Sequence, residues 1–137
     1  MKQAIFLILL TAITKSSFGQ FKTNDVQYDK DLCIKIEKRY DGACSNKTDI
    51  VVKITNKCSE TLDGMIAIEK EDGSWSKGYF NNLKPGASQD GFWTCKSSGQ
   101  VRIYRAKAGK AHLEDYPTEK QLRESFGTKK YGYNSNY

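Results

Sequence analysis

Hydrophobic and polar residues alternate along much of the chain, and alternation with a period of two is typical of β-strands with one buried face. In residues 32–40, for example, Ile34, Ile36 and Tyr40 fall on one face, whereas Lys35 and Glu37 fall on the other. The same pattern, followed along the chain, predicts strands at residues 32–40, 49–56, 62–70, 74–80, 87–95 and 100–106.

Turn residues separate these segments. Gly73 predicts a hairpin before residue 74, and Pro85-Gly86 fits a type II turn, in which proline presets φ and glycine supplies a positive φ. A further turn is predicted at residues 97–99 (SSG). Short strands separated by turns every eight to twelve residues or so are typical of a sandwich. We therefore predict a mainly β fold, an antiparallel β-sandwich of six to seven strands over residues 32–106.

The pattern changes after residue 106. Residues 107–127 are predicted to form a linker and a short C-terminal helix, because Thr118 and Gln121 have the spacing of a capping box. Leu122 and Phe126 share a helix face, and Gly127 fits the stop position. The polar, glycine-punctuated residues 128–137 are predicted to be a flexible tail.

The N-terminal residues have the order of a secretory signal peptide. A cationic start precedes the apolar run AIFLILLTAI, and Ser17 and Gly19 stand at the −3 and −1 positions of a cut before Gln20. The apolar run is too short to cross a bilayer. We therefore expect residues 1–19 to be a signal peptide, residues 20–31 a loose leader, and the mature chain secreted or periplasmic with no membrane span.

The formal net charge of +6 is spread over interspersed lysines, arginines and carboxylates. A nucleic-acid binder would gather its basic residues on one face or in one run. The charge pattern therefore predicts a solvated surface and no nucleic-acid partner.

Four cysteines in an exported chain predict two disulfides. Three pairings are possible, and we favour Cys58–Cys95 and Cys33–Cys44. A zinc site is the rival interpretation, but there is no C-x-x-C motif and the single histidine lies far from the cysteines. We therefore expect no metal and no cofactor.

Several short motifs resemble those of a known domain class. The motifs are NKC at residues 56–58, DGSW at 72–75, LKPG at 83–86 and WTC at 93–95. Together they resemble small exported bacterial domains of immunoglobulin-like or fibronectin-type-III-like form. The resemblance implies an architecture but no functional residue, because such domains share a scaffold without a shared chemistry.

Aromatic residues gather between residues 75 and 93. Strand alternation predicts that Trp75 and Tyr79 share one face and that Phe92 and Trp93 point in opposite directions. Most of these rings are expected in the core, because a sandwich must first fill its interior. An outward set of Trp75, Tyr79 and Trp93 is the candidate ligand-binding platform.

Catalytic signals are weak. His112 is the only histidine, and consecutive residues such as His112, Glu114 and Asp115 do not converge on one point along an extended chain. No nucleophile motif accompanies them, so we predict no catalytic residues. The expected function is a non-catalytic binding module that engages a protein partner at the cell envelope. The alternatives are a carbohydrate-binding module that uses exposed aromatics and a small secreted hydrolase based on His112.

Overall fold

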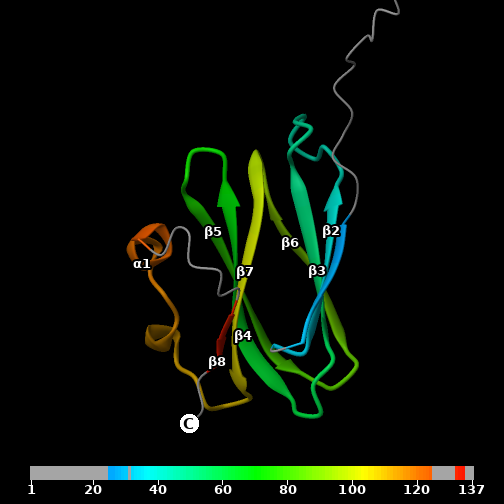
Figure 1. The fold of residues 1–137 in the computed structure, drawn as a ribbon, viewed down its shortest axis with the longest axis vertical. Helices are drawn as coiled ribbons and strands as arrows, with labels where there is room; N and C mark the ends of the chain where they lie inside the picture. The colour runs from blue at the N-terminus through cyan, green and yellow to red at the C-terminus, as the bar shows by residue number, and fades with distance from the viewer. Residues whose placement is uncertain (1–24, 31, 125–131, 135–137) are drawn as a thin grey trace, which may run out of the picture.

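The computed structural model of the chain describes residues 25–30, 32–124 and 132–134. Two β-sheets pack face to face, with a short helix outside them, which confirms the predicted β-sandwich (Figure 1). Sheet A has the strand order β1-β2-β3-β6, and sheet B has the order β5-β4-β7-β8. The strands are β1 (Asp25–Asp29), β2 (Ile34–Tyr40), β3 (Ile50–Asn56), β4 (Leu62–Lys70), β5 (Trp75–Leu83), β6 (Ser88–Thr94), β7 (Ser97–Lys107) and β8 (Gly132–Asn134).

The inner faces of the two sheets form one hydrophobic core. Alternation places every second residue of a strand in it. Ile36 of β2 pairs with Ile54 of β3, and both side chains are buried, while Lys35 and Glu37 face outward and form an ion pair. Sheet B contributes residues such as Phe80 of β5 to the same core. The burial of its apolar side chains therefore determines which face of sheet A packs against sheet B.

Sheet B is buried on both faces of its central strand. Along β4, Ile66 and Ile68 point toward sheet A, whereas Met65 and Ala67 belong to a second cluster on the opposite face. The run Met65–Ile68 is accordingly continuous in apolar residues rather than alternating. A strand with such a run needs cover on both sides.

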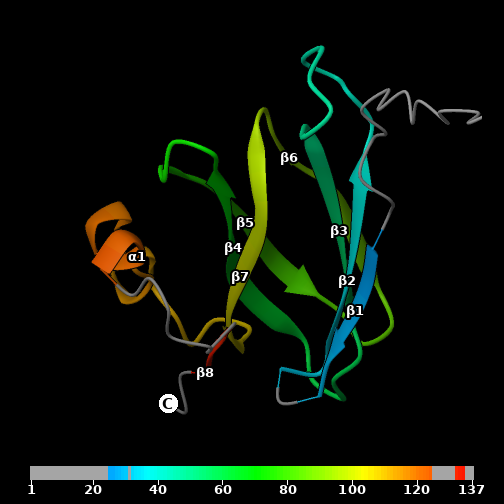
Figure 2. The ribbon, with the colours of Figure 1, turned by 45° about the horizontal axis from the view of Figure 1, so that its top comes forward.

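That cover comes from the segment with η1 (Leu113–Asp115) and α1 (Glu119–Glu124), which lies against sheet B on the side away from sheet A (Figure 2). Leu122 of α1 is fully buried there. The helix begins as predicted, since the Thr118 backbone N–H donates to the Gln121 side chain at 2.8 Å and the Gln121 N–H donates to Thr118 Oγ1 at 3.3 Å.

The two disulfides are Cys33–Cys58 and Cys44–Cys95, so the favoured pairing of Cys58 with Cys95 and of Cys33 with Cys44 is wrong. The reason is strand order. Cys33 precedes β2 and Cys58 follows β3, and because β2 and β3 are antiparallel neighbours, these two ends meet. Cys44 lies in the loop at the other end of this pair, and Cys95 follows β6 beside the start of β3.

The leader and the tail both contribute a strand, which corrects two expectations. β1, within the expected loose leader, pairs antiparallel with β2. β8, within the expected flexible tail, pairs parallel with β7. Each needs only one neighbour because it lies at a sheet edge. The expected signal peptide, residues 1–19, lies outside the described residues.

Two predicted turns have different outcomes. The type II turn is confirmed, because Gly86 has a φ of 76° and the Ala87 N–H donates to the Lys84 carbonyl. The turn predicted at residues 97–99 is wrong, since β7 already begins at Ser97 and the chain reverses at Lys96, whose φ is 49°. Among the described helices, none has the length and apolar character needed to cross a membrane.

Candidate functional site

A cleft opens between β5 and β6, which are edge strands of different sheets. The turn at residues 84–87 connects the two strands, so they diverge from a common end. Gly78 of β5 lies so close to the Phe92 ring that a Cβ at this position would stand 2.6 Å from Phe92 Cδ1. The glycine therefore lets Phe92 approach β5 at the inner end of the cleft.

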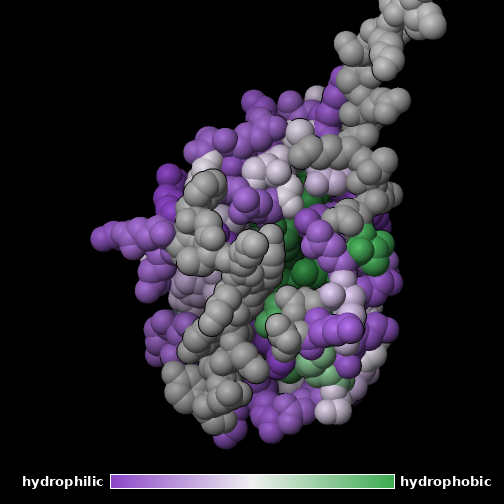
Figure 3. Space-filling view, viewed as in Figure 1, coloured by the Kyte–Doolittle hydropathy of each residue, from purple (hydrophilic) through white to green (hydrophobic). Residues whose placement is uncertain are grey.

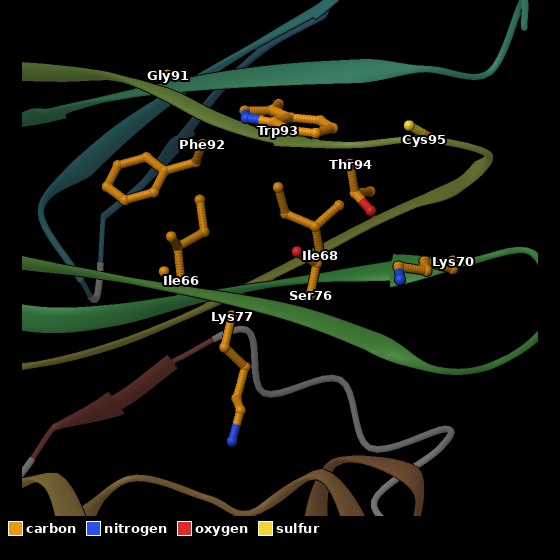
Figure 4. Close-up of a pocket in the computed structure, with 11 residues that line it drawn as sticks. Ile66, Ile68, Lys70, Ser76, Lys77, Gly91, Phe92, Trp93, Thr94 and Cys95 are labelled. Atoms are coloured by element: carbon orange, nitrogen blue, oxygen red, sulfur yellow. The ribbon is translucent and has the colours of Figure 1, made fainter. Parts of the chain in front are cut away.

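The cleft has an apolar floor and a volume of about 660 Å³. Ile66 and Ile68 of β4 form the floor, and Phe92 and Thr94 face them from β6 (Figure 4). Lys77 is drawn pointing away from the cleft on the other side of β5. The volume lies within the range of about 300–1,000 Å³ that is usual for ligand pockets.

Hydrogen bonds close the cleft at both ends. The Gln89 side-chain amide of β6 lies 3.5 Å from the Tyr79 carbonyl oxygen of β5. At the opposite end, the Glu71 N–H donates to the Lys96 carbonyl at 2.7 Å, which joins the β4–β5 turn to the β6–β7 turn. The cleft is thus short and lies along one side of the sandwich, with a hydrogen bond at each end.

The three aromatic residues of the predicted platform do not come together. Trp75 is only 6% exposed, because the α1 segment covers it and the Arg102 guanidinium lies 4.7 Å from its ring centroid. Tyr79 lies on the same face, as predicted, and is 39% exposed beside Tyr116. Trp93 is 58% exposed but projects from sheet A, on the other side of the molecule. A shared stacking surface of these three rings is therefore not formed.

His112 is exposed on the segment that leads into η1. The neighbouring Asp115 carboxylate accepts a hydrogen bond from the His112 backbone N–H at 2.7 Å. Asp115 therefore caps the backbone of this turn.

Asp49 is a carboxylate with several hydrogen bonds that sequence reasoning missed. It is buried and accepts hydrogen bonds from the backbone N–H groups of Cys44, Asn46 and Lys96. Burial acts to raise the pKa of Asp49, but these three hydrogen bonds and nearby Lys96 outweigh it and lower the pKa below its ordinary value. Asp49 holds the loop before β3 against the turn after β6.

Asp49 also lies within 4.8 Å of the sulfur atoms of Cys44 and Cys95. Those sulfurs are joined in a disulfide and carry no thiolate, which is the form that binds metals. Both oxygens of Asp49 already accept backbone hydrogen bonds. This group is structural, and the acidic hairpin residues are engaged as well, since Glu71 accepts from Thr48 and Asp72 from Ser74.

The surface seen in Figure 3 is mostly hydrophilic, and apolar residues are visible near its middle, between the two sheets.

The cleft residues Ile66 and Ile68 could not be distinguished from core residues in the sequence, because both roles require apolar side chains. What reveals the cleft is the assignment of β5 and β6 to different sheets.

No protein-family model matches the chain, and no curated protein or solved structure matches it.

Proposed function

We propose that this chain is a secreted or periplasmic binding module with no catalytic role, which engages a protein partner at the cell envelope through the β5–β6 cleft. Two disulfides indicate an oxidising compartment. The observation that carries the proposal is Trp93, which is 58% exposed at the rim of an apolar cleft. Tryptophan is enriched among the residues that dominate binding at protein interfaces.

The strand order supports a second part of the proposal, that the sandwich is immunoglobulin-like. In immunoglobulin domains, strands A, B and E share one sheet, and strands C, F and G share the other. Here β2, β3 and β6 lie in one sheet and β4, β7 and β8 in the other, in the same chain order. Two strands depart from the pattern. β5 has the chain position of strand D, which shares the sheet of A, B and E, but it pairs with β4. β8 runs parallel to β7, whereas immunoglobulin sheets are antiparallel.

The proposed function is tested by photo-crosslinking in the organism that makes the protein. A photoreactive amino acid replaces Trp93, and the adducts are identified by mass spectrometry. We expect a discrete protein adduct, because the side chain stands at the proposed interface.

Tyr28 is the matched control position. Its side chain is 53% exposed on the same outer face of sheet A, but it belongs to β1 at the opposite edge. Equal protein adducts from the two positions, or no protein adduct from position 93, would contradict the proposed function.

A further inference from the structure

Four aspartates of the chain are followed directly by glycine, at positions 41, 63, 72 and 90. In such a pair the backbone nitrogen of the glycine can attack the side-chain carboxyl carbon of the aspartate, because glycine has no side chain to obstruct the approach. The attack closes a five-membered cyclic imide. Hydrolysis of this imide can leave the main chain running through the aspartate side chain, as isoaspartate. All four pairs share this chemistry, so the fold decides which of them reacts.

The atoms that would react lie close together at Asp90 and Gly91. The Gly91 N–H donates a hydrogen bond to Asp90 Oδ1 at 2.8 Å. Reacting atoms about 3–3.5 Å apart are close to attack geometry, and the carboxyl carbon is one bond away from this oxygen. Both residues are exposed, so water can reach the imide. The space beside Gly91 is open as well, because no heavy atom of the described residues, its two chain neighbours aside, lies within 4 Å of where a Cβ would stand.

A β-bulge places the same two residues outside the regular strand ladder. The register of β6 against β3 runs to Gln89 and resumes at Phe92, so Asp90 and Gly91 together stand opposite one residue of β3. The extra residue of a bulge is left unpaired, and the ladder is locally disrupted. Closure of the imide ring therefore moves a part of β6 that the regular ladder does not hold.

The pair at Asp63 lacks both the contact and the space. The Asp63 carboxylate accepts hydrogen bonds from the backbone N–H groups of Asn82 and Gly109, both at 2.7 Å. Gly64 lies within β4 and packs directly against the Phe80 ring. The carboxylate is thus bonded to other parts of the chain, and the ring has no room to form.

The remaining two carboxylates are also bonded to groups other than the nitrogen of their own glycine. The Asp72 carboxylate accepts from the N–H and the hydroxyl of Ser74, and the glycine after it donates its N–H to the Lys70 carbonyl at 2.9 Å. The Asp41 carboxylate accepts from the Ala43 N–H at 3.1 Å, which is two residues further along and not one. Because Asp41 is exposed, its pair is the control for exposure alone.

Among the four pairs, Asp90 is thus the aspartate that accepts a hydrogen bond from the glycine that follows it. Arg39 opposes the reaction there, because its guanidinium bonds both carboxylate oxygens at 2.9 Å and one of these oxygens must leave. The two side chains of this ion pair are 49% and 44% exposed. An exposed ion pair slows the reaction by no more than about fivefold. The close approach of the nitrogen is the larger effect, worth roughly tenfold or more.

We infer that Asp90–Gly91 is the Asp-Gly pair at which the folded chain isomerises spontaneously, and that the Arg39 ion pair slows this step. The Gly91 nitrogen loses its proton and bonds to Asp90 Cγ, and one carboxyl oxygen leaves as water. Water then adds to the main-chain carbonyl carbon of Asp90 and breaks its bond to the nitrogen. The isoaspartate product therefore has the mass of the original chain. This chemistry is independent of the proposed function, since it needs no partner.

Isomerisation changes the surface beside the cleft. The main chain of β6 becomes longer by one carbon directly before the residues that line the cleft from this strand. The free carboxylate of the product is attached to the Cα atom and is one carbon shorter than the original side chain, so its bonds to Arg39 must change.

The test compares the folded chain with the unfolded chain. The full oxidised protein is incubated in warm, mildly acidic heavy-oxygen water, and the reduced, alkylated chain in urea serves as the unfolded reference. Hydrolysis of the imide adds one heavy oxygen, which peptide mapping locates, and electron-transfer fragmentation identifies the isoaspartate. In urea we expect similar rates at all four pairs. In the folded chain we expect Asp90 to react roughly tenfold or more faster than Asp41 and Asp72.

Two variants examine the contribution of the ion pair. Arg39→Gln removes the bonds to the Asp90 carboxylate, so we expect isomerisation at Asp90 to become up to about fivefold faster. Lys53→Gln is the matched control, because Lys53 lies opposite the bulge but pairs with Glu37 at 3.7 Å. We expect this variant to leave the rate at Asp90 unchanged.

Two results would overturn the inference. The first is isomerisation at Asp41 or Asp72 that is as fast as at Asp90 in the folded chain. The second is a rate at Asp90 that Arg39→Gln leaves unchanged, lowers, or raises no more than Lys53→Gln does. Neither result affects the crosslinking from position 93, so the proposed function is tested separately.

Discussion

Sheet A and sheet B are stabilised by different means. Sheet A carries both disulfides, Cys33–Cys58 at one end of the β2–β3 pair and Cys44–Cys95 at the other, and its outer face bears charged residues in contact with water. Sheet B has no cystine among its described residues and is covered by the α1 segment instead. Sheet A, which has one solvent-exposed face, is thus stabilised by disulfides. Sheet B, which is covered on both faces, is stabilised by the burial of apolar side chains.

The largest expected effect concerns the cystines of sheet A. Removing the Cys44–Cys95 pair by serine substitution should lower the free energy of unfolding by about 4 kcal/mol. Removing the Cys33–Cys58 pair should cost about 3.5 kcal/mol, because its loop is shorter, with a sequence separation of 25 rather than 51. Urea denaturation of the oxidised wild type and of each double variant measures both values.

Hydrogen exchange on the same variants shows whether the effect is confined to one sheet. We expect faster exchange in β2, β3 and β6 before any change in β4. Double variants as stable as the wild type, or peptide mapping that links Cys33 to Cys44, would refute the conclusion that these two disulfides stabilise sheet A.

The second effect concerns the cover of sheet B. Leu122→Ala removes a fully buried side chain between α1 and the sheet, so we expect a loss of about 3 kcal/mol in the free energy of unfolding. The Trp75 fluorescence should shift toward longer wavelength as its cover loosens. Leu113→Ala is the matched control from the same segment, because Leu113 is 68% exposed and its loss should change stability little. Equal stability of the two variants would mean that α1 contributes nothing to sheet B.

Asp49→Asn is expected to have the smallest effect on the free energy of unfolding at neutral pH. The dependence of this effect on pH distinguishes it from the effects above. The pKa of Asp49 is lowered in the folded state, so its ionised form contributes stability above the ordinary value of 3.8. That contribution is lost as the pH falls through the lower folded value. An asparagine amide would also place a donor against the backbone N–H groups that Asp49 accepts from.

The measurement for Asp49 is the free energy of unfolding from pH 2 to 7, a range wide enough to include the loss on acidification. Asp49→Asn should be less stable than the wild type at pH 7 and should show a flatter acid limb. Asp41→Asn serves as the control, since exposed Asp41 accepts a backbone hydrogen bond in the neighbouring loop. Parallel curves for the wild type and Asp49→Asn would exclude the assigned role.

The sequence alone determined the features that depend on neighbouring residues. Alternation in residues 32–40 and 49–56 predicted β2 and β3 to within two residues at each end. The Pro85-Gly86 turn and the Thr118–Gln121 cap were also predicted, because each is formed by residues a few positions apart. These signals reflect backbone geometry and local hydrogen bonding, which act over one turn or one strand.

Only the tertiary structure decided which distant segments meet. The disulfide pairing follows from the β2–β3–β6 order, and the burial of Trp75 follows from the return of α1 onto sheet B. The apolar run Met65–Ile68 was a signal for burial on both faces, yet it does not say what covers the second one. The position of β6 at the edge of sheet A depends in the same way on strand neighbours. Side-chain alternation reports which face of a strand is buried, but strand order is set by contacts far apart in the chain.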